Sequence, residues 1–356
     1  MAYTDIDDPS AYFQTAIYTG GGGNSSITND GNSDLKPDLV WFATRSATNN
    51  KPLLDSTRGG NKFIYSDLSQ GADTGDSGVG IATFNTDGFT FGSTEQTYFN
   101  DTNKTYVAWQ WKANGGTTAS NTTGDINTTT QVNSDAGFSI VTYTGNGGTN
   151  QTVGHGLGVA PQVIIVKNRE VSANWIVYHH KIGTSQYLYL DSAQGAADSS
   201  NIWGSSAPSS TTFTVQQHNE YNDSGEGLVA YCFAEKQGYS KFGSYVGNGV
   251  ANNGPFVYLG FKPAFVMIKS TTATGAHIMW DLKRSPFNLM DDIINAAEAD
   301  AESSNGIYGM DALSNGFKIK NTGTNNGTNQ SGTKYVYYAF AENPFTTSTG
   351  IPTTAR

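Results

Sequence analysis

The sequence predicts an all-β protein of three tandem antiparallel β-sandwich modules, of jelly-roll or lectin-like type, with one short helix. Four short motifs recur three times in the same order along the 356 residues. Several segments alternate between apolar and polar residues with a period of two, which is typical of strands. Charged residues make up only 14% of the chain, and its 42 glycines indicate many turns.

The four motifs keep nearly constant spacing between copies, which favours duplication of one unit of structure. Each copy opens with an aromatic residue and a glycine turn, continues with a proline-led apolar strand and a short alternating strand, and closes with an aromatic strand. The opening aromatics are Tyr18, Tyr143 and Tyr245; the proline-led strands are 36–45, 160–169 and 262–271; the short strands begin at Phe89, Phe213 and Phe317; the closing strands begin at Tyr106, Leu228 and Tyr335.

The proline-led strands carry consecutive apolar residues, as in 163–166. Such runs predict strands that are buried on both faces. The closing strands instead alternate, so one face should cover a core. We expect their repeated aromatics to fill that core and Gln110, on the other face, to tolerate truncation to alanine. These expected core residues are Trp109, Trp111, Tyr231, Phe233, Tyr338 and Phe340.

Asp55, His179 and Asp281 lie at equal distances from the leading prolines, and Arg58 and Arg284 follow the two aspartates by three positions. This spacing predicts an ion pair that stabilises a turn. A shared binding site is the alternative, and the histidine in the second copy weakens it.

Alanines and early acidic residues predict one helix, over 287–303. The predicted organisation has a polar linker that is poor in apolar residues between the first two modules. Its parts are an N-terminal arm (1–14), a first sandwich (15–113), the linker (114–136), a second sandwich (137–238), a third sandwich (239–345) and a C-terminal tail (346–356).

The charge and the apolar pattern exclude some classes of partner. A net charge of −10 and a pI of about 4.8 argue against binding nucleic acid or anionic membranes through a basic face. No apolar run approaches the roughly 18 residues that span a bilayer, and the N-terminus lacks the pattern of a secretory signal. The single cysteine, Cys232, can form no disulfide within the chain.

Motifs with known chemistry are incomplete, so we predict no catalytic residue, metal site, cofactor or enzymatic activity. The GDSG at 75–78 precedes every histidine, whereas a trypsin-like serine follows its histidine. Asp30 opens a segment with calcium-loop spacing, but Trp41 stands at its twelfth position, which leaves only a looser surface site open. The adjacent His179 and His180 would point to opposite faces of a strand.

The motifs DPSAYFQTAIYTG, KPDLVWFATR with LLDSTRG, APQVIIVKNR with NWIVYHH, and GFTFG with YVAWQWKA together resemble a family of virion proteins of marine bacteriophages, especially phages of cyanobacteria. The resemblance covers residues 9–345, about the whole chain. It implies localisation in the virion and a capsid decoration, head appendage or tail fibre that contacts other virion proteins. A homo-oligomer is also expected.

Two other functions remain open at this stage. The first is a carbohydrate-binding adhesin that recognises a host surface glycan through the loop aromatics Trp175, Trp203 and Tyr221. The second, with less support, is a polysaccharide depolymerase. Binding of glycan would separate the adhesin from a purely architectural protein, and release of reducing ends from host glycan would reveal the depolymerase.

Overall fold

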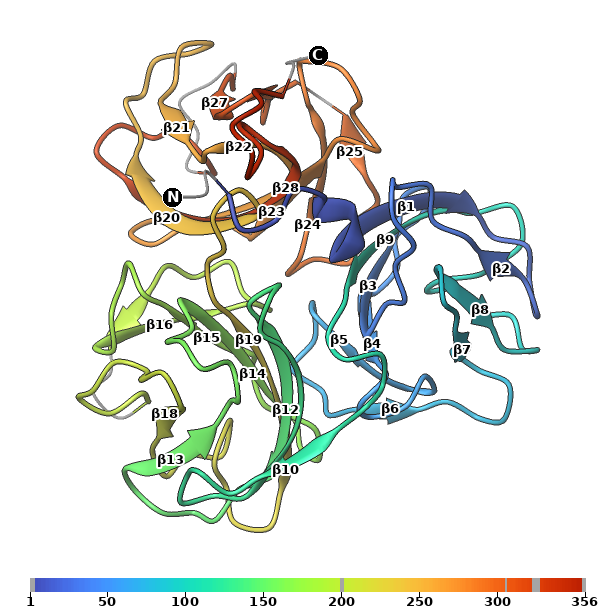
Figure 1. Cartoon of the computed structure of the whole chain (residues 1–356), viewed down its shortest axis with the longest axis vertical. Helices are drawn as coiled ribbons and strands as arrows, with labels where there is room; N and C mark the ends of the chain where they lie inside the picture. Colours follow the sequence, from blue (N-terminus) through green and yellow to red (C-terminus); the bar gives the residue numbers. More distant parts are fainter. Residues whose placement is uncertain (1–3, 199–201, 305, 322–326, 354–356) are drawn as a thin grey trace.

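The computed structural model describes residues 4–198, 202–304, 306–321 and 327–353. Within these ranges the chain is all β, and its only helical segment is the 3-10 turn η1 (Pro9–Ala11). Figure 1 shows three groups of strands around a common centre, coloured blue, green and orange to red in chain order. We call them modules 1, 2 and 3. No helix in the described ranges is long and apolar enough to cross a membrane.

Module 1 consists of one large and one small antiparallel sheet. The closing strand β9 lies inside the large sheet, between the first strand and the proline-led strand. The large sheet has the order β1 (Phe13–Thr19), β9 (Thr105–Trp111), β3 (Leu39–Thr44), β4 (Pro52–Asp55), β5 (Lys62–Tyr65) and β6 (Asp73–Thr74); the small sheet has the order β2 (Ser26–Ile27), β8 (Phe89–Phe91) and β7 (Ile81–Phe84).

Module 2 has the same strand order and two additional strands, β10 and β11, which extend the edge of its large sheet. These two strands come from the segment expected to be a linker. The large sheet has the order β10 (Ala119–Asn121), β11 (Thr128–Asn133), β12 (Phe138–Thr144), β19 (Gly227–Phe233), β14 (Val163–Asn168), β15 (Ile176–His179), β16 (Gln186–Tyr189) and β17 (Ala197–Asp198); the small sheet pairs β13 (Gln151–Gly154) with β18 (Thr212–Val215).

Module 3 repeats the order of module 1 in both sheets, so the strand order agrees with the threefold repetition of the sequence. Where one module ends and the next begins stays a prediction. The large sheet has the order β20 (Ser240–Val246), β28 (Lys334–Pro344), β22 (Phe261–Ser270), β23 (Ile278–Asp281), β24 (Asp292–Asn295) and β25 (Ser303–Ser304); the small sheet has the order β21 (Phe256–Tyr258), β27 (Gly316–Ile319) and β26 (Met310–Leu313).

Each large sheet packs one face against its own small sheet and so forms a sandwich. In module 2, Val141 and Ile164 of the large sheet share an apolar cluster with Val153 and Phe213 of the small sheet. Modules 1 and 3 have equivalent clusters. The proline-led strands are therefore covered on this face, and all six residues of β3 and of β14 are buried.

The opposite faces of the three large sheets meet in one shared core at the centre of the molecule. The repeated aromatics of the closing strands lie here and are at most 7% exposed. Their burial agrees with the prediction, but the alternating pattern did not indicate that all three modules use the same core. The six aromatics are Trp109, Trp111, Tyr231, Phe233, Tyr338 and Phe340.

The helix predicted over 287–303 is wrong, because the described chain there forms strands β24 and β25. β24 pairs with β23, and Met279 lies opposite Ile294. The consecutive residues Ile293 and Ile294 enter opposite cores, the first that of module 3 and the second the shared core. A strand can bury two neighbouring residues in this way, so tertiary packing overrides the helical preference of the nearby alanines.

Gln110 does not lie on an outward face, as its expected tolerance of truncation requires, because its face of β9 covers the interior of module 1. The side chain is fully buried, and its Nε2 donates to Oδ1 of Asn29 at 2.6 Å. We therefore expect Gln110→Ala to lower the free energy of unfolding by about 1–3 kcal/mol, since it removes a fully buried side chain and its hydrogen bond to Asn29. Urea denaturation measures this cost. The exposed Gln70→Ala is the control, and equal midpoints for the two variants would contradict the prediction.

Candidate functional site

The ion pair predicted between Asp55 and Arg58 is present and lies buried between modules. Arg58 Nε contacts Asp55 Oδ2 at 2.5 Å, and the backbone N–H of Arg58 donates to Asp55 Oδ1 at 2.8 Å. The hydroxyl of Tyr231, from module 2, donates to Asp55 Oδ2 at 2.8 Å. The pair thus stabilises its own turn and also joins module 1 to module 2.

The equivalent pair in module 3 makes the equivalent contact with module 1. Arg284 Nε lies 2.5 Å from Asp281 Oδ2, and both side chains are fully buried. Trp109 Nε1 donates to the same carboxylate oxygen at 3.0 Å, and the Arg284 guanidinium lies 5.5 Å from the centre of the Trp109 ring. Trp109 and Tyr231 occupy corresponding positions of their closing strands.

His179 takes the place of the aspartate in module 2 and faces module 3. Its Nδ1 accepts the N–H of Lys181 at 3.2 Å, so Nε2 carries the proton and donates to the carbonyl of Tyr337 at 3.3 Å. The ring of Tyr338 meets the imidazole edge-on at 5.1 Å. Burial lowers the pKa of His179 to about 3, which keeps the ring neutral. A neutral ring without an arginine partner suits an interface rather than acid–base chemistry.

Two buried lysines join the modules through backbone carbonyls. Lys167 Nζ of module 2 donates to Ser69 O of module 1 at 2.7 Å. Lys269 Nζ of module 3 donates to Ser192 O of module 2 at 2.8 Å. Both lysines are fully buried at the same position of the proline-led strand. Burial lowers the pKa of Lys167 to about 8 and that of Lys269 to about 7.

A third buried lysine, Lys51, completes the cycle from a different strand position. Its Nζ donates to the carbonyls of Glu298 and Asp300 in module 3, the latter at 3.1 Å. Module 1 has Ala43 where the other modules have lysine, and Lys51 approaches from the segment before β4 instead. Burial lowers the pKa of Lys51 to about 8. Each module therefore sends one lysine to a neighbour, and the contacts close into a ring.

The repeated glycine turns are held by a tyrosine and an asparagine in every module. In module 2, Tyr143 Oη donates to Tyr221 O at 2.7 Å. Asn222, fully buried, accepts the N–H of Asn146 at 3.1 Å and donates to Gly148 O at 2.8 Å. The corresponding asparagines of modules 1 and 3, which make equivalent bonds to their own turns, are Asn100 and Asn329.

We expect Asn222→Ala to loosen this turn, because it leaves backbone groups of the turn without their partner. The free energy of unfolding should fall by about 1–3 kcal/mol. Amide hydrogen exchange should quicken in residues 145–150 but not in the equivalent turn 247–252 of module 3, which serves as the internal control. Unchanged exchange in both turns would contradict the role of Asn222.

The three aromatics predicted to recognise a surface glycan do not lie on the surface. Trp175 is fully buried, and its Nε1 donates to Tyr65 O of module 1 at 2.7 Å. Trp203 is 2% exposed and Tyr221 is fully buried, and both pack in the interior of module 2. They were expected to lie on exposed loops, but each joins an apolar cluster in the interior. The expectation that these three side chains are exposed is therefore wrong, and they are not available on the surface to stack on a sugar.

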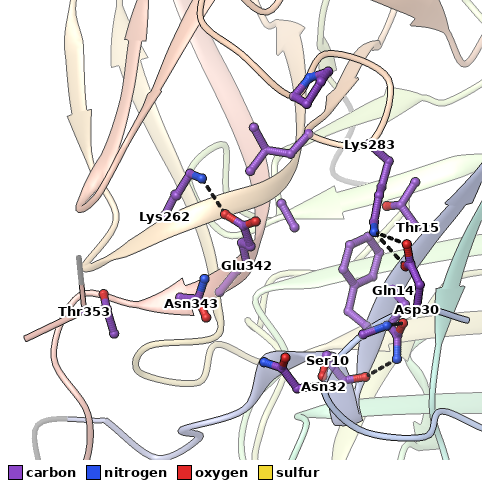
Figure 2. A pocket seen from close by; sticks show the side chains of 16 residues that line it. Ser10, Gln14, Thr15, Asp30, Asn32, Lys262, Lys283, Glu342, Asn343 and Thr353 are labelled. Atoms are coloured by element: carbon purple, nitrogen blue, oxygen red, sulfur yellow. Dashed lines mark hydrogen bonds and ion pairs between the residues drawn. The ribbon is translucent and has the colours of Figure 1, made fainter. Parts of the chain in front are cut away.

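Cleft A, with a volume of about 660 Å³, lies between modules 1 and 3, and Figure 2 shows its lining. Two ion pairs lie along it. Lys262 Nζ contacts Glu342 Oε2 at 2.6 Å within module 3, and Lys283 Nζ contacts Asp30 Oδ1 at 2.6 Å across the two modules. Asp30, from the segment with calcium-loop spacing, is thus paired with a lysine. The remaining polar lining residues are Ser10, Gln14, Thr15, Asn32, Asn343 and Thr353.

Cleft B, with a volume of about 580 Å³, lies between modules 2 and 3 in the place that corresponds to cleft A. Lys241 in its lining corresponds to Gln14 of cleft A. The third such place, between modules 1 and 2, is occupied by Gln131 of β11. This amide is fully buried, accepts N–H groups from Asn114 and Gly116, and donates to Thr57 Oγ1 at 2.8 Å.

The arrangement offers binding surfaces more than reactive groups. No group of three or more His, Cys, Asp or Glu side chains in the described ranges could hold a metal ion. Cys232 is buried, and burial raises the pKa of its thiol to about 12, which makes it a poor nucleophile. The sequence did not indicate either cleft, because each is formed by residues of two modules.

The fold and these sites define an all-β protein in which sandwich modules surround a shared core and leave polar clefts between them. The chain belongs to the family described as a domain of unknown function, DUF7483, whose model matches residues 8–344. No curated protein and no solved structure matches the chain.

Proposed function

We propose that this chain is a non-enzymatic structural protein exposed on the surface of a phage particle, as a capsid decoration, head appendage or tail fibre. The observation that carries the proposal is that the recurring residues lie in the shared core or at the contacts between modules. The repeated aromatics fill the shared core, and the repeated Asp–Arg pairs and buried lysines join neighbouring modules. Residues that recur in two or in all three modules therefore serve assembly of a rigid body rather than a reaction.

The surface composition supports the same proposal. Few charges and many Thr, Asn, Ser and Gly residues give a surface that bonds water through uncharged groups. Such groups lose little to screening in a salt-rich medium, whereas exposed ion pairs weaken. The partners on this proposal are other virion proteins, with further copies of the chain in a homo-oligomer.

Labelling of purified phage particles tests the proposal. An antibody against this chain should decorate intact particles, and electron microscopy should place the label at the head or at the tail. Mass spectrometry of the same particles should detect the chain in stoichiometric amounts. Absence of the chain from purified particles would overturn the assignment.

A carbohydrate-binding adhesin is the second candidate, and the inter-module clefts favour it. Hydroxyl, amide and charged side chains line both clefts, and such groups suit the hydroxyls of a sugar. The two functions are compatible, since a surface protein of the particle can also contact the envelope of a host.

A further inference from the structure

Module 3 carries two exposed aromatic residues at positions where the fold does not require them. Phe256 and Tyr258, on β21, are 47% and 54% exposed and flank the buried Val257. The matching strand positions are Ser26 and Thr28 in module 1, and Thr152 and Gly154 in module 2, as the pairing of the small sheets shows. Small polar residues are therefore compatible with this strand.

The two side chains point to the same face of β21, and Tyr258 borders cleft B. Residues i and i+2 of a strand point to the same face and lie about 7 Å apart. Tyr258 and Phe345, which is 37% exposed, both line cleft B. Lys241 Nζ donates to Tyr258 O at 2.9 Å and lies 5.2 Å from the centre of the Tyr258 ring, which fixes the ring beside the cleft.

We propose that cleft B and the adjoining rings of Phe256 and Tyr258 form a binding site for a saccharide chain. The proposal deepens the adhesin function and rests on it. Aromatic rings offer flat apolar faces for the C–H faces of sugar rings, and the neighbouring polar groups offer hydrogen bonds to the hydroxyls. Rings spaced along one strand suit successive units of an extended chain.

The character of cleft B favours a saccharide over a protein segment. Its lining contains two acidic side chains, Asp5 and Glu235, and two basic ones, Lys236 and Lys241. Because both signs of charge are present, the cleft does not favour a peptide of one charge. Its polar groups offer directional hydrogen bonds. Exposed aromatics beside polar groups are typical of sites that bind amphipathic ligands.

The test measures binding of hexasaccharides of glucose, N-acetylglucosamine, mannose and galactose to the full chain by isothermal titration calorimetry. We expect at least one to bind. The double variant Phe256→Ser, Tyr258→Thr places the residues of module 1 in module 3, so it should fold normally and lose affinity at least tenfold. The matched control is Phe287→Ser, which removes an aromatic that is 81% exposed and lies outside the lining of cleft B. Its affinity should equal that of the wild type.

Two outcomes would overturn the site. The first is that none of the four hexasaccharides binds the wild-type chain. The second is that the double variant, with an unchanged melting temperature, binds as tightly as the wild type. Labelling of particles is independent of both outcomes, so failure of this site and failure of the virion assignment can be told apart.

Discussion

Replacing Trp109 by alanine is expected to lower the free energy of unfolding by about 3–5 kcal/mol and to weaken module 3 as well as module 1. The side chain is fully buried in the shared core, and its ring meets Phe265 of module 3 at 5.7 Å. Its Nε1 also donates to the buried carboxylate of Asp281. Truncation therefore opens a cavity between modules and removes a hydrogen bond from an ion pair in module 3.

Hydrogen exchange distinguishes this shared role from a local one. The control is Phe89→Ala, which removes a fully buried ring from the core that belongs to module 1 alone. Urea denaturation should report a large loss for both variants. Amide hydrogen exchange should quicken in β22 and β23 for Trp109→Ala but not for Phe89→Ala, because Trp109 contacts module 3 and Phe89 lies in the core of module 1. Unchanged exchange of those strands in Trp109→Ala would mean that the modules are independent.

The sequence predicts the strands well where a residue's environment is set by its own module. Alternation along the closing strands and apolar runs in the proline-led strands follow from the pleat, and both patterns led to the correct strand type. The ion pairs of Asp55 with Arg58 and of Asp281 with Arg284 also followed from spacing alone, although their burial did not. In these cases the partners lie a few residues apart, so local geometry decides the contact.

The sequence fails where residues far apart in the chain decide the environment. Trp175 directly precedes strand β15, and its indole N–H donates to the carbonyl of Tyr65 in another module. Ile293 and Ile294 enter two different cores, which a helical pattern does not anticipate. Clefts A and B depend on how the modules close around the centre. Comparing the copies with each other was the available signal for Phe256 and Tyr258, since modules 1 and 2 have small residues there.

The free energy of unfolding is expected to rise by roughly 4 kcal/mol between pH 7 and pH 9, because buried lysines are costly to charge. The pKa of Lys269 falls to about 7 in the folded chain, and those of Lys51 and Lys167 fall to about 8, all from burial. An unfolded lysine titrates near its ordinary value of 10.5. Across this window the unfolded chain holds more protons than the native chain, so raising the pH favours folding.

Above about pH 9 the sign reverses, because many buried tyrosines then outweigh the three lysines, and this sets a maximum. Burial raises the pKa of Tyr143 and Tyr245 well above 10, so the unfolded chain loses phenolic protons that the native chain retains. Stability should therefore fall again in this range.

The variant Lys269→Met isolates the contribution of one lysine, because methionine fills similar space without a charge. Melting temperatures measured from pH 6 to pH 10.5 should rise less steeply with pH for this variant than for the wild type. Lys318→Met is the control, since this lysine lies on β27 and bonds the side chain of Asn253 at an exposed site; its profile should match that of the wild type. Equal slopes of melting temperature against pH for Lys269→Met and the wild type would contradict the prediction, because they would show that burial does not lower the pKa of Lys269.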